Sequence, residues 1–358
     1  METPTRTLAQ ALCLVRQYGV WRAGRRACFD AARRAGWVKW RFPVWQWSER
    51  PAETWFAEPI SGGAAGVHAL LANSTTRFWF PRGSPPRPNP EWARGAVVEA
   101  EGLLRGTFRY FFHREGNLGV PQPDWHLNPF TGRHAPPTKH WCDSRDFEPG
   151  RGDIKVLWEP SRFGWVYGLA RAYAVSSDER FAECFWRLLE SWQAANPPQM
   201  GVHWQCGQEI AFRVLACILG LYAFWASPAS SPGRVAQLLV LLAGSAERII
   251  ANNDYARMQM GNHAVTEAAA LFAVGTLFPQ LRDAARWRAR GQWVLEDEAH
   301  RYNWPDGAYV QHSLNYQRLT LRAYLTAFRL AELNGASFAS DTRDRLKKSL
   351  HFLYELQD

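Results

Sequence analysis

A two-helix unit that returns about every 50 residues constrains this 358-residue chain more than any other feature. Each unit joins two amphipathic segments through a short run of turn residues, such as Ser-Pro-Ala-Ser-Ser-Pro-Gly at 227–233. The four pairs are residues 159–175 with 178–195, 206–225 with 234–251, 262–278 with 281–302, and 311–335 with 342–356. Such a repeat predicts either an open solenoid or a ring of helical hairpins.

Polar clusters at the start of the first helix in each pair decide between these two architectures. They are Trp158, Glu159 and Arg162; Trp204, Gln205, Gln208, Glu209 and Arg213; Asn262, His263 and Glu267; and Gln311, His312, Tyr316 and Arg318. The inner helices of a hairpin ring run parallel, so all four clusters would meet at one rim. Helix starts carry unpaired N–H groups and the positive end of the dipole, which favour anions. We therefore predict a mainly α fold, an incomplete α/α toroid with a cleft at one end.

The first 150 residues lack this regularity. Helical spacing is present over residues 5–36, short extended pieces are expected at 42–47 and 76–81, and a helix is expected at about 89–104. The Pro- and Gly-rich stretch 106–139 predicts strands and long loops, which are often functional. We divide the chain into an N-terminal helical arm with an irregular segment, 1–150, and the incomplete toroid, 151–358.

Composition narrows the class of partner. A net charge of +9 and a pI near 9.4 favour an anionic partner: nucleic acid, a membrane surface or an acidic polysaccharide. The 19 tryptophans suit contacts with sugar rings, although most tryptophans in any fold belong to the core. We find neither an apolar stretch long enough to span a membrane nor a signal peptide in residues 1–26, which predicts a cytoplasmic protein.

The candidate site residues each have a simpler structural interpretation. His263 could cap its helix, and Glu267 one turn later could orient it or share a metal with it. Zinc requires a third ligand at a recognisable spacing, which is absent, so we expect no metal and no cofactor. The pairs Glu159–Arg162 and Glu209–Arg213 have the spacing of ion pairs that would brace the rim, or they contact the substrate.

Two further residues could take part in proton transfer or binding. Asn262 stands where a helix N-cap is expected. Tyr316 lies one turn into its predicted helix, near Arg318 and Arg322. A cation beside a tyrosine favours the phenolate and makes the group a usable proton carrier.

As a set, these motifs resemble the heparinase II/III family of polysaccharide lyases. The resemblance rests on Asn262-His263 with Glu267, on Asp306-Gly307 followed by Gln311-His312-Ser313 and Tyr316, and on the two upstream clusters around Trp158 and Trp204. It covers roughly residues 150 to 335. The family combines an incomplete α/α toroid with a large antiparallel β-sandwich domain. Its members cleave uronate-containing polysaccharides such as heparan sulfate and heparin by β-elimination.

The resemblance implies a role for three residues. Removal of the C5 proton of a uronate requires that the neighbouring carboxylate be neutralised. In the family an asparagine does this, which matches Asn262, and a tyrosine is the general acid, which matches Tyr316. His263 would assist carboxylate binding or proton transfer. The expected substrate contacts are Glu159, Arg162, Trp204, Gln208, Glu209, Arg213, Glu267, Gln311, His312 and Arg318.

The sequence also departs from the family. A catalytic histidine of characterised members comes from the β-sandwich domain, and this chain stops at Asp358. We therefore expect a missing C-terminal domain or a second chain to complete the cleft. The predicted partner is an acidic polysaccharide and not nucleic acid, and family resemblance favours the periplasm. The alternatives are a glycoside hydrolase on an α/α toroid, with Glu159, Glu209, Glu267 and Asp306 as candidate carboxylates, and a non-catalytic polyanion-binding fragment.

Overall fold

The computed structural model describes residues 20–356, which are mainly helical. The N-terminal part contains α2 (Val20–Arg34), α3 (Trp37–Arg41), α4 (Gly63–Ala72) and α5 (Pro90–Leu104). Helix α5 has the predicted bounds because Asn89 accepts a hydrogen bond from the Trp92 backbone N–H at 2.9 Å and Pro90 suits the first turn. Helix α4 was not predicted. The sequence at 42–47 and 76–81 forms no strand, and residues 5–19 lie outside the described part.

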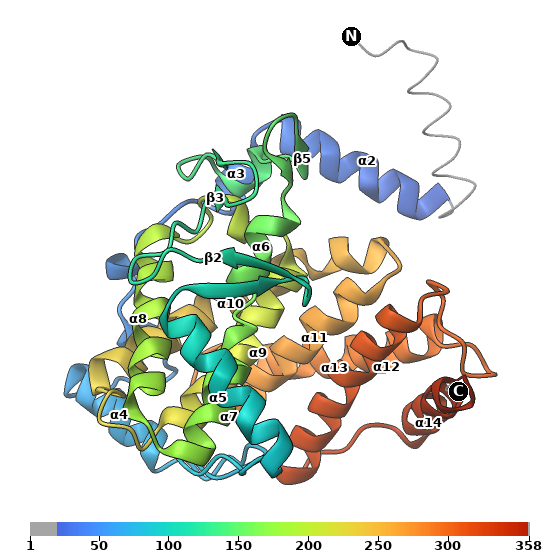
Figure 1. Ribbon diagram of the computed structural model, residues 1–358. Coiled ribbons are helices and arrows are strands. Elements are labelled where there is room, and N and C mark those ends of the chain that lie inside the picture. The colour runs from blue at the N-terminus through green and yellow to red at the C-terminus, as the bar shows by residue number, and fades with distance from the viewer. Residues whose placement is uncertain (1–19, 357–358) are drawn as a thin grey trace.

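Short antiparallel strand pairs follow α5, as predicted for residues 106–139. They are β1 (Thr107–Tyr110) with β2 (Arg114–Asn117), β3 (Leu127–Asn128) with β4 (Arg133–His134), and β5 (Phe147–Glu148) with β6 (Gly152–Asp153). In the first pair Thr107 lies opposite Asn117 and Tyr110 opposite Arg114, so a three-residue turn closes the hairpin. This hairpin lies across the front of the molecule in Figure 1.

Four helical hairpins make up the rest of the chain. They are α7 (Trp165–Ser176) with α8 (Glu179–Ala195), α9 (Gly207–Phe224) with α10 (Pro232–Met258), α11 (Asn262–Leu277) with α12 (Ala284–Tyr302), and α13 (Leu314–Leu333) with α14 (Ser340–Glu355). The prediction of one helix over 159–175 was wrong. A short helix, α6 (Lys155–Ser161), ends first, because Phe163 adopts a left-handed φ of 60° that breaks the helix.

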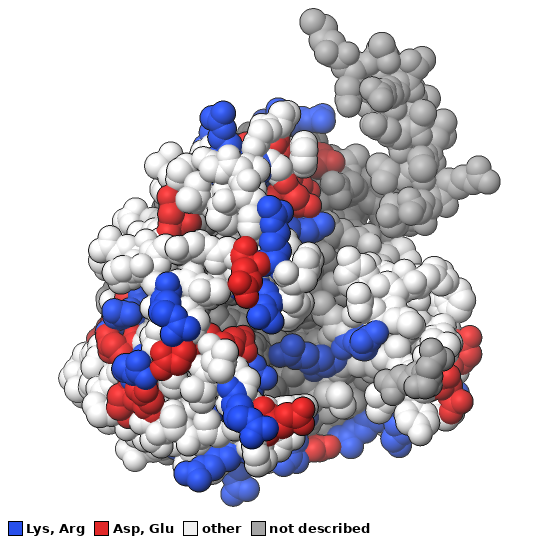
Figure 2. Space-filling view, viewed as in Figure 1, with Lys and Arg blue, Asp and Glu red and all other residues white. Residues whose placement is uncertain are grey.

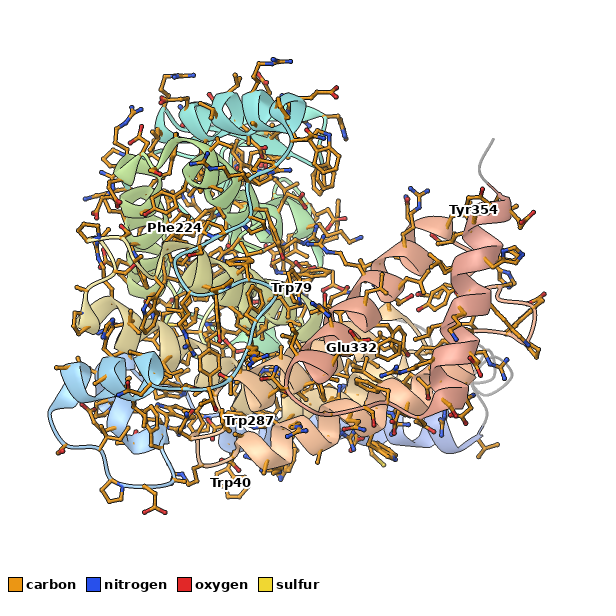
Figure 3. All side chains as sticks on the ribbon, turned by 90° about the horizontal axis from the view of Figure 1, so that it is seen from below. Trp40, Trp79, Phe224, Trp287, Glu332 and Tyr354 are labelled. Carbon is orange, nitrogen blue, oxygen red and sulfur yellow. The ribbon has the colours of Figure 1, made fainter. Side chains whose placement is uncertain are left out.

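The first helices of the hairpins form the inner layer of an incomplete ring. Helix α7 packs on α9, α9 on α11 and α11 on α13, while α5 covers the free side of α7. Figure 1 shows this order from green through orange to red. In Figure 3, with the described side chains drawn, α13 and α14 project from the body, with Tyr354 at the far end, and a notch stays open beside them. The predicted incomplete α/α toroid is confirmed.

Aromatic and aliphatic side chains fill the centre of the ring. Trp125, Trp186, Trp192, Trp204 and Trp287 are among the largest fully buried side chains, so these five belong to the core. By length and composition, α9 and α10 could cross a membrane, which corrects the prediction that no stretch is apolar enough. Most of each helix is buried inside the fold, as expected for the centre of a ring. The same hydrophobic core includes residues from before and after position 150. The division of the chain into residues 1–150 and 151–358 stays a prediction.

Candidate functional site

The starts of α9 and α11 lie against each other and form the base of the candidate site. Gln208 donates through Nε2 to Thr266 Oγ1 at 3.3 Å, and Thr266 donates to the Asn262 carbonyl at 3.0 Å. A Cβ atom at Gly207 would lie 2.2 Å from Oε1 of Glu267, so only glycine allows this approach. The third polar cluster therefore packs on the second, as the ring architecture predicts.

Arg162 joins the first polar cluster to the second. Its Nη1 lies 2.5 Å from Glu159 Oε2, while Nε and Nη2 lie 2.5 and 2.9 Å from the two carboxylate oxygens of Glu209. Both carboxylates are buried, and burial raises the pKa of Glu159, an effect that Arg162 opposes. The predicted Glu159–Arg162 ion pair is confirmed. Glu209 pairs with Arg162 and not, as predicted, with Arg213.

Asn262 and His263 occupy the first turn of α11. The Asn262 backbone N–H donates to Gln311 Oε1 at 3.1 Å, which ties this helix start to the fourth cluster. Within residues 20–356, the buried side-chain amide of Asn262 has no hydrogen-bond partner. His263 is half-buried, and burial lowers the pKa of its imidazole, so that the ring is neutral at pH 7. An unpaired amide and a neutral imidazole thus stand side by side.

The fourth cluster is more open to solvent. His312 adopts a φ of 49° and packs edge-on against Trp304, with ring centroids 5.5 Å apart. Ser313 caps α13 by accepting the backbone N–H of Tyr316 at 3.4 Å. The Tyr316 side chain is 45% exposed, and Arg318 is exposed one turn into the same helix. These side chains are accessible to a large ligand.

Figure 2 shows that the surface is hollowed beside this region and that Lys and Arg side chains lie in the hollow. Two other surface cavities, of about 430 and 300 Å³, share Arg50 and Glu247 and contain none of the clustered residues. Among residues 20–356, no group of three His, Cys, Asp or Glu side chains is arranged to hold a metal ion. The polar groups of the four clusters are amide, imidazole, phenol and charged side chains.

Residues 92–357 match the family model described as heparinase II/III N-terminus. The chain belongs to the heparinase II/III family. A heparin-sulfate lyase of Bacteroides thetaiotaomicron is 24% identical over 301 residues, which are 81% of this chain and 41% of that protein. A heparin-sulfate lyase of Pedobacter heparinus is 26% identical over 181 residues, 49% of this chain and 27% of that protein.

Solved structures share the fold. A heparinase III structure, the BT4657 gene product with methylated lysines, has a TM-score of 0.61 at 20% identity and is matched over 81% of this chain and 44% of its own length. The crystal structure of heparan sulfate lyase HepC from Pedobacter heparinus has a TM-score of 0.59 at 20% identity. The match covers 82% of this chain and 44% of the HepC chain. The chain thus spans less than half the length of these relatives.

Two expected substrate contacts of this heparinase II/III chain belong to the core instead. Trp204 has no exposed surface. Arg213 is also fully buried; it donates to the Ser161 and His203 carbonyls at 2.9 and 3.0 Å and lies over the Trp192 ring. Burial lowers the pKa of Arg213 to about 9. Neither side chain is accessible to a ligand in this structure: Trp204 ends a short 3-10 turn before α9, and Arg213 lies within α9, which is buried on nearly every side.

Glu267, another expected substrate contact, has a side chain that is buried beneath the surface. Its Oε2 accepts a hydrogen bond from Asn253 Nδ2 at 3.1 Å, and the side chain is 2% exposed. Burial raises the pKa of Glu267 to about 8, so the carboxyl keeps its proton at neutral pH. The carboxyl lies between Asn253 and the start of α9 at Gly207.

Sequence reasoning missed two contributors to the site. The Cys206 thiol lies 3.6 Å from Nδ1 of His263. Phe111, at the tip of the β1–β2 hairpin, donates its backbone N–H to Glu159, which helps to keep the pKa of that carboxyl down. The position of Cys206 at the first residue of the predicted helix 206–225 was a usable signal. No local pattern predicts the contact of the hairpin with α6.

Proposed function

We propose that this chain carries the toroid part of a polysaccharide lyase that cleaves a uronate-containing acidic glycan by β-elimination. One observation carries the proposal: the unpaired amide of Asn262 stands beside a neutral imidazole at the rim. In addition, two of the relatives are named heparin-sulfate lyases. Heparan sulfate or a similar surface polysaccharide is the substrate class we propose.

The proposed chemistry divides the work between two helix starts. Asn262 would donate a hydrogen bond to the uronate carboxylate, where negative charge increases as the C5 proton leaves. Tyr316 would donate its phenolic proton to the leaving glycosidic oxygen at C4. The C4–O bond breaks, a C4–C5 double bond forms, and no water is consumed. Arg318, His312 and Gln311 line the open side, where a polyanion would pass.

We propose further that residues outside this chain, in a C-terminal domain or a second polypeptide, complete the cleft. Support comes from the lengths: the chain spans 41–44% of two relatives with which it aligns over most of its own residues. The notch beside α13 and α14 is the side on which such a partner would close the site. The division into residues 1–150 and 151–358 belongs to the same proposal.

A glycoside hydrolase fits the geometry less well. Hydrolysis requires two carboxyl groups on opposite sides of one bond, about 5 to 9.5 Å apart. Glu159 and Glu209 are both held by the same arginine, and Glu267 is enclosed. Asp306 accepts the Ala308 backbone N–H at 3.0 Å in a surface turn. None of the four is a free carboxyl group paired with another across an open cleft.

The test incubates the chain, joined or mixed with the proposed C-terminal domain or second polypeptide, with heparan sulfate and with an unsulfated uronate polymer while ultraviolet absorbance is recorded. A lyase produces unsaturated uronate ends that absorb, whereas a hydrolase produces reducing ends without absorbance. Tyr316→Phe should reduce the rate by about 10²–10⁴-fold, the usual contribution of a general acid. Tyr354→Phe, on exposed α14, is the matched control and should leave the rate unchanged. Salt-sensitive binding without any unsaturated product would favour the non-catalytic polyanion-binding interpretation.

A further inference from the structure

A thiol and an imidazole meet between the starts of α9 and α11. Cys206 immediately precedes α9, His263 is the second residue of α11, and Sγ lies 3.6 Å from Nδ1. Cys206 also packs against a small apolar cluster formed by Ala135, Ile154, Leu157, Trp158 and Val202. The thiol therefore contacts apolar side chains as well as a strong nitrogen acceptor.

The protonation states of this pair follow from its surroundings. Burial raises the pKa of the Cys206 thiol to about 12, and the charge of Glu209 acts in the same direction. The backbone N–H groups of Glu209 and Gln208, which donate to the sulfur, oppose this rise. Burial lowers the pKa of His263; Glu209 opposes this, while Arg162 and Lys155 add to it. At neutral pH the Cys206 sulfur is therefore protonated, and the His263 imidazole carries a proton on only one of its two nitrogens.

A second histidine beside a cysteine, His140, has a tautomer that its own contacts fix, and it can therefore serve as a reference. Nδ1 of His140 lies 3.0 Å from Cys142 Sγ, and its Nε2 lies 2.8 Å from the Phe42 carbonyl oxygen. A carbonyl oxygen only accepts, so Nε2 holds the ring proton. Burial lowers the pKa of His140, so the ring is neutral and its Nδ1 is an acceptor. It accepts the Cys142 backbone N–H at 3.2 Å, while the Cys142 thiol donates to Asp143 Oδ1 at 3.8 Å.

We propose that Cys206 is a positioning residue, whose S–H donates to Nδ1 of His263 and holds this imidazole in the Nε2–H tautomer. The second ring nitrogen then presents a hydrogen-bond donor next to the Asn262 amide. This donor role rests on the proposed function, in which the ligand is a uronate carboxylate. Amide and imidazole together would supply two neutral donors to one carboxylate, which favours carboxylate binding over proton abstraction as the task of His263.

Nuclear magnetic resonance of the ring nitrogens tests the tautomer directly, without any need for activity. The protein is labelled with ¹⁵N in histidine, and long-range proton–nitrogen correlations are recorded at roughly pH 8, above the ordinary histidine pKa. His263→Gln and His140→Gln assign the two signals. We expect both rings to show the Nε2–H pattern, with His140 as the internal reference.

Substitution of the thiol then tests its role. Cys206→Ala should convert the His263 signals to a mixture of tautomers, and Cys206→Ser, which keeps a donor, should restore the Nε2–H pattern. Cys28→Ala removes an exposed thiol and should change neither ring. An Nδ1–H pattern in the unmodified protein, or a His263 pattern that Cys206→Ala leaves unchanged, would overturn the proposal.

Turnover supplies a second, separable readout. Cys206→Ala should lower kcat/KM for the uronate polymer about 3- to 10-fold, which corresponds to one weak hydrogen bond, and Cys206→Ser should recover most of it. Absence of lyase activity in every variant, with the proposed C-terminal domain or second polypeptide present and with the expected tautomer, would refute the proposed function and leave the thiol–imidazole bond standing. Normal kcat/KM in Cys206→Ala would refute the donor role.

Discussion

Replacement of Glu267 by Gln should change how the stability of the fold depends on pH. The carboxyl is 2% exposed, and its Oε2 accepts a hydrogen bond from Asn253. Its pKa is about 8 in the folded chain against an ordinary value of 4.5, with burial as the largest cause. Between these two values the folded state holds one proton that the unfolded state releases.

The sign of the effect follows from this proton. Stability changes with pH in proportion to the protons bound by the unfolded state minus those bound by the folded state. That difference is minus one for Glu267 between its two pKa values. The free energy of unfolding therefore falls as pH rises, by up to about 1.4 kcal/mol per pH unit. The contribution is fully present below the unfolded value and is lost near pH 8.

Urea unfolding, followed by tryptophan fluorescence at a series of pH values from 5 to 8, measures this slope; these limits lie roughly within the two pKa values. Gln has the same shape and no titrating proton. In Glu267→Gln the free energy of unfolding should therefore fall less steeply with pH than in the unmodified chain, by a difference in slope that corresponds to nearly one proton. Glu296→Gln, on the partly exposed side of α12, is the matched control and should keep the original slope. Equal slopes for Glu267→Gln and the unmodified chain would refute the claim that this carboxyl is buried and protonated.

Two further substitutions probe the packing of the rim. Gly207→Ala places a methyl group 2.2 Å from Oε1 of Glu267 and should lower the free energy of unfolding by about 1–3 kcal/mol in the urea assay. The control is Gly233→Ala, where a Cβ meets nothing within 4 Å, and it should lower the free energy of unfolding by less than half as much. Arg162→Met removes the cation shared by two buried carboxylates and should cost about 3–5 kcal/mol at neutral pH, with a smaller loss when acid protonates them. An unchanged urea midpoint in Gly207→Ala or in Arg162→Met would contradict the packing described.

Much of the fold was predictable because hairpin turns and helix caps are local. Asn89 with Pro90 fixes the start of α5, and the run of Ser and Pro before α10 predicted a start at residue 234, two residues after the observed start at Pro232. The left-handed Phe163 was not predictable, because a non-glycine residue with positive φ is held by its tertiary surroundings and has no local signal. It divided one expected helix into two.

The candidate site was predictable only where its contacts are local. The i,i+3 spacing of Glu159 and Arg162 predicted their ion pair correctly. The partner of Glu209 lies 47 residues away on another helix, so spacing within one helix favoured the wrong arginine, Arg213. Helical periodicity shows which residues share a face, but it does not show that a central helix is covered on nearly every face.

The central claim is that the rim binds and neutralises a uronate carboxylate for β-elimination. The most direct measurement compares the formation of unsaturated uronate from heparan sulfate with that from the same polymer after reduction of its carboxyl groups, which leaves the sulfates in place. We predict product only from the polymer with intact carboxylates, and a loss of about 10²–10³-fold in Asn262→Ala. Equal cleavage of both polymers, or full activity in Asn262→Ala, would contradict the account.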